Sequence, residues 1–236
     1  SHYRNGWMTT YSRPGQLLAA AGFAVFFPNY RGSTGRGVEF SKLSQGDPAG
    51  AEFDDIVDAK RHLVEAGLAD PDRMVIRGGS AGGFTVLGAL TQADTFAAGS
   101  CSYGIADLSV LAADTHKFES RYDHWLIGPY PEQRSLYVQR SPIHFTEQLN
   151  CPLILFQGLE DRVVPPSQAE LMFAALQAKG IPVAYLPFAG EQHGFRRAEN
   201  IKRVLEAELY FYGKVFGFEP ADRIEAVAIE NLPAHG

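Results

Sequence analysis

A serine held between glycines is the part of the sequence best suited to chemistry. Gly78, Ser80 and Gly82 form a Gly-x-Ser-x-Gly pattern, with an apolar run before it and a helix-forming run after it. This order predicts a strand, a tight turn and a helix, with the serine at a strained position of the turn. The residues two before and two after the serine crowd each other, so both must be glycine. The hydroxyl of Ser80 is then expected at a helix N-terminus, where the backbone amide of Ala81 can stabilise a developing oxyanion.

Glycine-rich turns also occur for other reasons, and the sequence separates some of them. Gly-x-Ser-x-Gly is found in many ordinary turns, so the strand and helix around it are what favour a nucleophile here. A dinucleotide-binding Gly-x-Gly-x-x-Gly pattern fails because Ser80 stands where its second glycine belongs. The glycine-rich segment Arg31–Gly37 also fails, because Phe40 stands where the last glycine belongs.

A serine nucleophile needs a base, and the base needs a carboxylate. Histidine accepts a proton near neutral pH, and a carboxylate fixes its tautomer and stabilises the imidazolium. Of the seven histidines, only His193 follows a late strand and precedes a terminal helix. Glu160 and Asp161 both follow another strand, and spacing alone does not separate them. The order serine, acid, histidine is that of α/β hydrolases.

The elements around these residues alternate between helix and strand, which predicts a mostly parallel sheet with helices on both faces. Five apolar runs are predicted as strands: Phe23–Phe27, Met74–Ile76, Ala97–Ser102, Pro152–Phe156 and Val183–Leu186. The expected helices are Pro14–Ala21, Glu52–Ala66, one directly after Ser80, one that opens at Pro165–Pro166 and ends at Gly180, and one that carries Ile201–Tyr212. The run Phe23–Phe27 is continuously apolar, as expected for a strand buried on both faces.

This alternation also places the candidate side chains. In parallel sheets, sites form beyond the carboxyl ends of the strands. Ser80, Asp161 and His193 each follow a predicted strand, so we expect all three at one edge of the sheet.

Two stretches are less regular. Tyr103–Asn150 is rich in aromatic residues, which fit equally well a substrate pocket or a cover over the core; they are Phe118, Tyr122, Trp125, Tyr130, Tyr137 and Phe145. The tail from Glu219 to Gly236 is expected to be irregular. Because the sequence shows no repeat and no linker, we expect residues 1–236 to form one domain.

Composition excludes several classes of protein. The 236 residues carry a net charge of −6 without a basic block, which argues against binding nucleic acid or an anionic membrane surface. No apolar run approaches the length of a membrane span, and the N-terminus does not resemble a signal peptide. Cys101 and Cys151 flank apolar runs, so buried reduced thiols and a cytoplasmic location are expected. No metal or organic cofactor is expected, because the His-Glu-x-x-His, paired Cys-x-x-Cys and P-loop patterns are absent from the sequence.

Four blocks in the same order resemble the catalytic domain of the prolyl oligopeptidase family of serine peptidases, and its acylaminoacyl-peptidase-like branch most of all. They are Pro28–Gly35, Gly78–Gly83, Gln157–Asp161 with Val164-Pro165, and Glu191–Phe195. The segment Thr115–Tyr122 resembles a further block of some bacterial-type members. The resemblance covers roughly residues 1–218. It implies Ser80 as nucleophile, His193 as base, Asp161 rather than Glu160 as acid, and the Ala81 amide as one oxyanion donor.

The resemblance also implies parts that this chain does not show. Members usually carry an N-terminal β-propeller that restricts access to the site, and a His-Gly-Gly-Pro segment that helps to build the oxyanion hole. Without that segment we expect weak catalysis, since one lost oxyanion donor costs on the order of a hundredfold. We also expect Phe23–Phe27 to lack its neighbour toward the elbow strand, because the N-terminal strands of the sheet are missing. The block around Tyr30 is expected to be structural, with Arg31 paired to a carboxylate such as Asp54 or Asp55.

The expected function is therefore hydrolysis of peptide bonds in short peptides. One alternative is an esterase or other acyl hydrolase, since fold and triad do not define the leaving group. Another is a non-catalytic fragment or binding module that keeps the motif without a working site. The sequence leaves open the specificity, the pocket residues and whether the chain forms a homo-oligomer.

Overall fold

The computed structural model describes residues 12–43, 50–93, 95–114 and 127–233, without the side chains of residues 113 and 114. The block Thr115–Tyr122 and the aromatic residues Phe118, Tyr122 and Trp125 lie outside the described residues. Within these ranges, the five predicted helices and four of the five predicted strands are found, and short helices that the sequence analysis did not predict occur at residues 38–42, 108–114 and 134–140.

The helices and strands have the following bounds. The helices are α1 (Arg13–Ala20), α2 (Val38–Lys42), α3 (Ala51–Glu65), α4 (Ala81–Gln92), α5 (Leu108–Asp114), α7 (Arg134–Arg140), α8 (Pro166–Lys179) and α9 (Ala198–Phe216), with short 3-10 turns at Pro71–Arg73 and Pro142–Gln148. The strands are β1 (Val75–Gly79), β2 (Ala98–Ser102), β3 (Leu153–Gly158) and β4 (Val183–Phe188).

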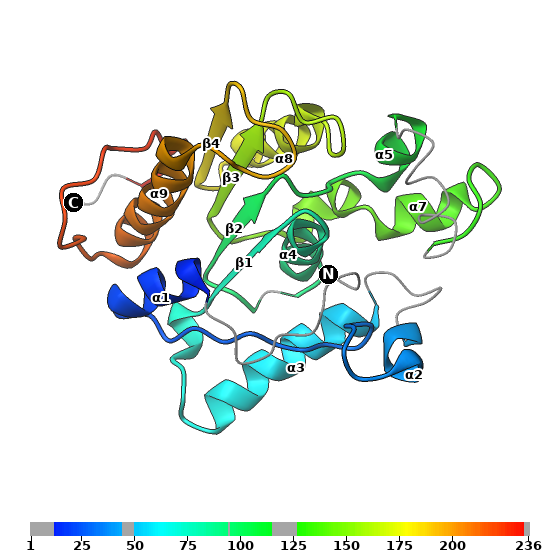
Figure 1. Ribbon diagram of the computed structural model, residues 1–236, viewed down its shortest axis with the longest axis horizontal. Coiled ribbons are helices and arrows are strands. Elements are labelled where there is room, and N and C mark those ends of the chain that lie inside the picture. Colours follow the sequence, from blue (N-terminus) through cyan, green and yellow to red (C-terminus); the bar gives the residue numbers. More distant parts are fainter. Residues whose placement is uncertain (1–11, 44–49, 94, 115–126, 234–236) are drawn as a thin grey trace.

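The four strands form one parallel sheet in the order β1-β2-β3-β4 (Figure 1). Each strand pairs with the next one along the chain, and a helix or a longer connection lies between them. A parallel pair needs such a crossover, because the chain must return to the same end of the sheet. The carboxyl ends of β1, β3 and β4 therefore lie along one edge, as the sequence predicts.

Helices cover both faces of the sheet, which confirms the predicted architecture (Figure 1). Alternate residues of β3 point to opposite faces. Leu153 and Leu155 pack with side chains of α4 and α8, while Ile154 and Phe156 pack with side chains of α9. The sheet is thus a buried layer between two apolar cores, which gives the loops at its edge a rigid support.

The prediction of a strand at Phe23–Phe27 is wrong. This segment has no strand pairing with any described residue, and Phe26 is 53% exposed. Among the described strands, β1 lies at an edge of the sheet and pairs only with β2. A mostly apolar cavity of about 1360 Å³ lies between β1 and residues 21–28 and is lined by both. A strand is defined by hydrogen bonds to a neighbouring strand, and the described residues include no strand that pairs with Phe23–Phe27.

Several smaller expectations agree with the structure. Arg31 pairs with Asp55, its Nε donating to Oδ1 at 2.9 Å and its backbone amide to Oδ2 at 2.7 Å. Both cysteines are buried and neither forms a disulfide with a described residue, and burial raises the pKa of the Cys101 thiol to about 12. Tyr137, in the irregular stretch, is fully buried, so packing over the core is the correct interpretation for this residue.

In the described ranges, no helix is long and apolar enough to cross a membrane.

Candidate active site

Ser80 lies in the turn between β1 and α4 and has a strained backbone. Its φ is 58° and its ψ is −125°, a conformation that non-glycine residues rarely adopt. A Cβ atom added to Gly78 would overlap the backbone carbonyl of Gly82. The crowding that the sequence predicts for this turn is therefore present, and it explains why Gly78 carries no side chain.

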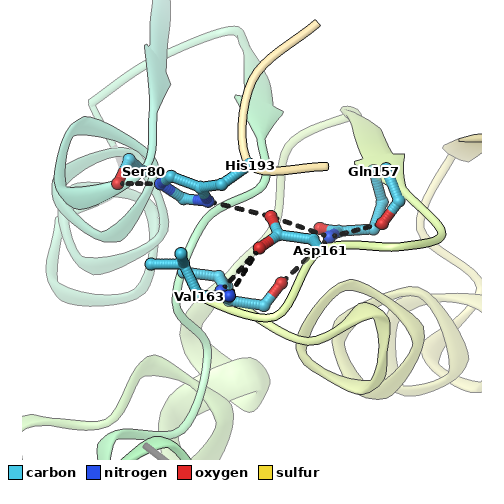
Figure 2. A network of polar contacts seen from close by, with 7 residues as sticks. Ser80, Gln157, Asp161, Val163 and His193 are labelled. Atoms are coloured by element: carbon cyan, nitrogen blue, oxygen red, sulfur yellow. Dashed lines mark hydrogen bonds and ion pairs between the residues drawn. The ribbon is translucent and has the colours of Figure 1, made fainter. Parts of the chain in front are cut away.

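Ser80, His193 and Asp161 form a continuous chain of hydrogen bonds, shown in Figure 2. The Oγ atom of Ser80 lies 2.7 Å from Nε2 of His193. On the other side of the imidazole, Nδ1 lies 2.8 Å from Oδ2 of Asp161. The structure thus brings together three side chains that are separated by 81 and 32 positions in the sequence. In this geometry Nδ1 donates to the carboxylate, which leaves Nε2 to accept the proton of the serine.

The carboxylate of Asp161 is buried and held by the loop that follows β3. Its Oδ1 accepts hydrogen bonds from the amides of Val163 at 2.8 Å and Val164 at 2.9 Å. The side-chain amide of Gln157 approaches Oδ2 at 3.4 Å and also donates to the carbonyl of Val164 at 3.0 Å (Figure 2). Glu160, which the spacing could not separate from Asp161, is exposed. The carboxylate that faces His193 is therefore that of Asp161.

The loop that carries His193 is attached to α9 by a buried carboxylate, that of Glu191. Its two oxygens accept hydrogen bonds from the amides of Arg196 and Arg197, both at 2.9 Å, and from the side chain of Asn200 at 2.8 Å. Burial by itself would raise the pKa of Glu191, but these donors and the charge of Arg197 outweigh it and lower the pKa. The ionised carboxylate therefore holds the loop against the first turn of α9.

The backbone amide of Ala81 opens α4 directly after Ser80. The first amides of a helix have no acceptor inside the helix, and they lie at the positive end of its dipole. They are thus available to an oxyanion, the negatively charged oxygen of a carbonyl group whose carbon has bonded to Oγ of Ser80. The sequence predicts this placement from the strand, turn and helix pattern alone.

An ion pair lies beneath the turn, on the strand that leads into it. Arg77 donates through Nε and Nη2 to the two oxygens of Glu208, at 2.9 and 3.0 Å, and Tyr212 donates to the same carboxylate at 3.0 Å. The side chain of Glu208 is completely buried. Burial would lower the pKa of Arg77, but the charge and hydrogen bonds of Glu208 raise it. This pair joins β1 to α9, the two elements that position Ser80 and the His193 loop.

Three residues of the site were not found by sequence reasoning: Tyr103, Gln157 and Glu191. Gln157 and Glu191 belong to the blocks that carried the resemblance, which was the available signal for them. Tyr103 directly follows β2, and its ring centroid lies 5.0 Å from that of His193. Its position at the carboxyl end of a strand was a signal, but a tyrosine there suggests no particular chemistry.

A parallel sheet between helices, with a serine at a strand-to-helix turn, defines an α/β hydrolase. Residues 9–219 match the prolyl oligopeptidase family, and the chain belongs to this family of serine peptidases. The family expected from the four sequence blocks is thereby confirmed.

Its relatives include two kinds of peptidase. The chain is 36% identical over 193 residues to dipeptidyl aminopeptidase BIII of Pseudoxanthomonas mexicana, covering 79% of this chain and 28% of that protein. It is 30% identical over 199 residues to the acylamino-acid-releasing enzyme of Arabidopsis thaliana, covering 81% of this chain and 26% of that protein. The chain is thus similar to both kinds of enzyme over about four fifths of its own length.

A solved structure shows the same fold. A puromycin-hydrolyzing peptidase of Mycobacterium tuberculosis superposes with a TM-score of 0.82 at 46% identity, covering 86% of this chain and 31% of that chain. This chain spans between 26% and 31% of the length of these three similar proteins.

Proposed function

We propose that this chain is the catalytic part of a serine peptidase that hydrolyses peptide bonds in short peptides through an acyl-enzyme on Ser80. The observation that carries the proposal is the hydrogen-bonded chain from Ser80 Oγ through His193 to Asp161, with distances of 2.7 and 2.8 Å. A serine hydroxyl is a weak nucleophile until a base removes its proton, and this arrangement supplies the base in contact with it.

In the first half of the reaction, Nε2 of His193 accepts the proton of Ser80 as Oγ bonds to the carbonyl carbon of the substrate. The carbonyl oxygen becomes an oxyanion, which the Ala81 amide stabilises at the N-terminus of α4. The imidazolium then donates its Nε2 proton to the leaving nitrogen, and the carbon–nitrogen bond breaks. The amine product departs, and the acyl group remains on Ser80.

In the second half, water replaces the amine. Nε2 of His193 takes a proton from water as the water oxygen bonds to the acyl carbon. The second tetrahedral intermediate collapses, the proton returns to Oγ of Ser80, and the carboxylic acid product leaves. Asp161 accepts from Nδ1 throughout and stabilises the imidazolium in both halves.

The relatives suggest which amides to test. One similar structure is named for hydrolysis of puromycin, an aminoacyl amide, and two similar proteins are named for release of dipeptides or acylamino acids. The last two names describe release of a short unit. We propose an exopeptidase or aminoacyl-amide hydrolase activity, with a short acyl part on Ser80.

A fluorophosphonate probe tests the site directly, because it reacts with a serine that a base and an oxyanion site activate. We expect labelling of the wild-type chain, none of Ser80→Ala, and unchanged labelling of Ser135→Ala, which alters an exposed serine on α7. Labelling that persists in Ser80→Ala would contradict the proposal.

Substrate comparison then separates the peptidase from an esterase. Aminoacyl, dipeptidyl and acylaminoacyl anilides, together with puromycin, are compared with a p-nitrophenyl ester. Turnover of an amide supports the peptidase, and turnover of the ester alone supports an esterase. Binding of a peptide without turnover of either supports a binding module. The β-propeller partner and the cytoplasmic location stay predictions from the sequence.

A further inference from the structure

The orientation of the His193 ring determines both of its hydrogen bonds. Nε2 faces Ser80 and Nδ1 faces Asp161, and the preferred directions of both contacts lie in the plane of the imidazole. Rotation of the ring about its Cβ–Cγ bond tilts this plane and bends both hydrogen bonds away from their preferred angles. A side chain packed against the imidazole restricts this rotation.

Tyr103 supplies a contact of this kind. Its ring centroid lies 5.0 Å from that of His193, with the planes at 65°, and 5.3 Å from that of Phe195, with the planes at 69°. These are the edge-to-face distances at which aromatic rings attract each other. Phe195 in turn contacts Phe188 at the end of β4, with 5.0 Å between the centroids. The loop therefore packs against Tyr103 through the rings of His193 and Phe195.

The backbone of Tyr103 is fixed in an unusual conformation. It directly follows β2, its φ is 40°, and its amide donates to the carbonyl of Phe156 in β3 at 2.7 Å. A bulky residue with positive φ is rare and persists only where its surroundings require it. A Cβ atom on Gly79 would lie 3.0 Å from the tyrosine ring, so the ring also touches the residue before Ser80. One side chain therefore contacts the turn of the serine and the loop of the histidine.

We propose that Tyr103 is a positioning residue, whose ring keeps the imidazole of His193 aligned between Ser80 and Asp161. This inference rests on the proposed serine hydrolase chemistry and gives Tyr103 a role beside Ser80, His193 and Asp161. The tyrosine acts through its ring face and edge, so phenylalanine serves equally well. Its strained backbone is then explained, because a relaxed φ would turn the ring away from both partners.

The alignment is measured by NMR on protein labelled with ¹⁵N-histidine, where His193 is assigned by the loss of its signals in His193→Gln. In the wild type we expect contacts between ring protons of Tyr103 and His193, and a slowly exchanging Nδ1–H held by Asp161. Tyr103→Leu removes the ring, so the Nδ1–H signal of His193 broadens through exchange with water. Tyr103→Phe keeps the wild-type signals.

Reactivity is measured on the same proteins as the rate of fluorophosphonate labelling. Misalignment of a catalytic group lowers such rates by roughly 10- to 100-fold, and we expect a loss of this size in Tyr103→Leu. Tyr103→Phe is expected to stay within about threefold of the wild type. The matched control is Tyr185→Leu, since Tyr185 is also half-buried and contacts a phenylalanine, Phe173, at 5.7 Å. It is expected to lower the melting temperature without changing the His193 signals or the labelling rate.

Three results overturn the positioning role. They are wild-type spectra without the Tyr103–His193 proton contacts, a folded Tyr103→Leu with unchanged His193 signals and labelling rate, and equal losses in Tyr185→Leu. The first needs no variant of Tyr103, so it decides the matter even where Tyr103→Leu does not fold. Wild-type protein that shows the aligned His193 but cleaves no amide would reject the proposed function and leave the positioning role intact.

Discussion

Gly78 and Gly82 face each other across the turn that carries Ser80, and the carbonyl of Gly82 occupies the place of a side chain on Gly78. The strained backbone of Ser80, with its φ of 58°, therefore requires a glycine at position 78. The position of the Ser80 hydroxyl thus depends on the absence of a single methyl group.

Gly78→Ala is expected to abolish fluorophosphonate labelling and to lower stability by about 1–3 kcal/mol, because the turn must open to admit the methyl group. Gly180→Ala is the control, since Gly180 has a positive φ of 79° but open space where a Cβ atom would lie. The control is expected to lose about 1 kcal/mol from backbone strain and to keep its labelling rate. Wild-type labelling in Gly78→Ala would show that the turn tolerates a side chain.

Neighbouring carboxylates after β3 provide a second comparison. Asp161 accepts from His193, whereas the adjacent Glu160 is exposed. Asp161→Asn is expected to lower kcat by roughly 10⁴, because the amide favours the wrong imidazole tautomer. Glu160→Gln is expected to change kcat by less than about threefold, since surface charges act weakly. Similar losses in both variants, measured with the best substrate of the panel, would contradict the assignment of the acid.

The buried pair beneath the turn is expected to matter mainly for stability. Arg77→Leu leaves the fully buried carboxylate of Glu208 with Tyr212 as its remaining donor, and a loss of roughly 3 kcal/mol is expected. The double variant with Glu208→Leu should lose less, because no charge is then stranded. The control is Lys202→Ala, which removes an exposed ion pair and should cost less than about 1 kcal/mol. Urea unfolding measures all three, and a double variant worse than Arg77→Leu would refute the explanation.

Acidification is expected to weaken the attachment of the His193 loop through Glu191. The folded state lowers the pKa of Glu191 below its ordinary value of 4.5, so its contribution is fully present above that pH. The contribution is lost as the pH falls through the folded pKa, when the carboxylate gains a proton. Glu191→Gln should therefore lose about 1–3 kcal/mol at pH 7 and approach the wild type in strong acid.

Unfolding free energies between pH 3 and pH 7 check this behaviour. The control is Glu199→Gln, which alters an exposed carboxylate in the first turn of α9. Its difference from the wild type should stay small at every pH. A gap between Glu191→Gln and the wild type that widens on acidification would have the wrong sign for a lowered pKa.

Much of the site could be predicted because it depends on local patterns. Strand, turn and helix signals surround Ser80, and apolar strands precede Asp161 and His193, so parallel pairing alone brings the three ends together. The choice between Glu160 and Asp161 depends on a turn held by the amides of Val163 and Val164, which spacing does not reveal. The role of Tyr103 depends on a positive φ and on a contact across the sheet edge, and neither leaves a pattern in the sequence.

The segment Phe23–Phe27 shows the opposite case, in which a strong local signal failed. Its apolar run fits a buried strand, but a strand forms only when a neighbour pairs with its backbone. In the structure, a cavity separates this segment from β1. We therefore expect the amides of Ala24, Val25 and Phe26 to exchange with solvent within minutes, whereas those of β3, paired on both sides, exchange only on global unfolding. Hydrogen exchange read by mass spectrometry compares the two segments in one sample. Slow exchange throughout Phe23–Phe27 would show that its backbone is paired in solution, and that the sequence-based assignment of a strand was correct after all.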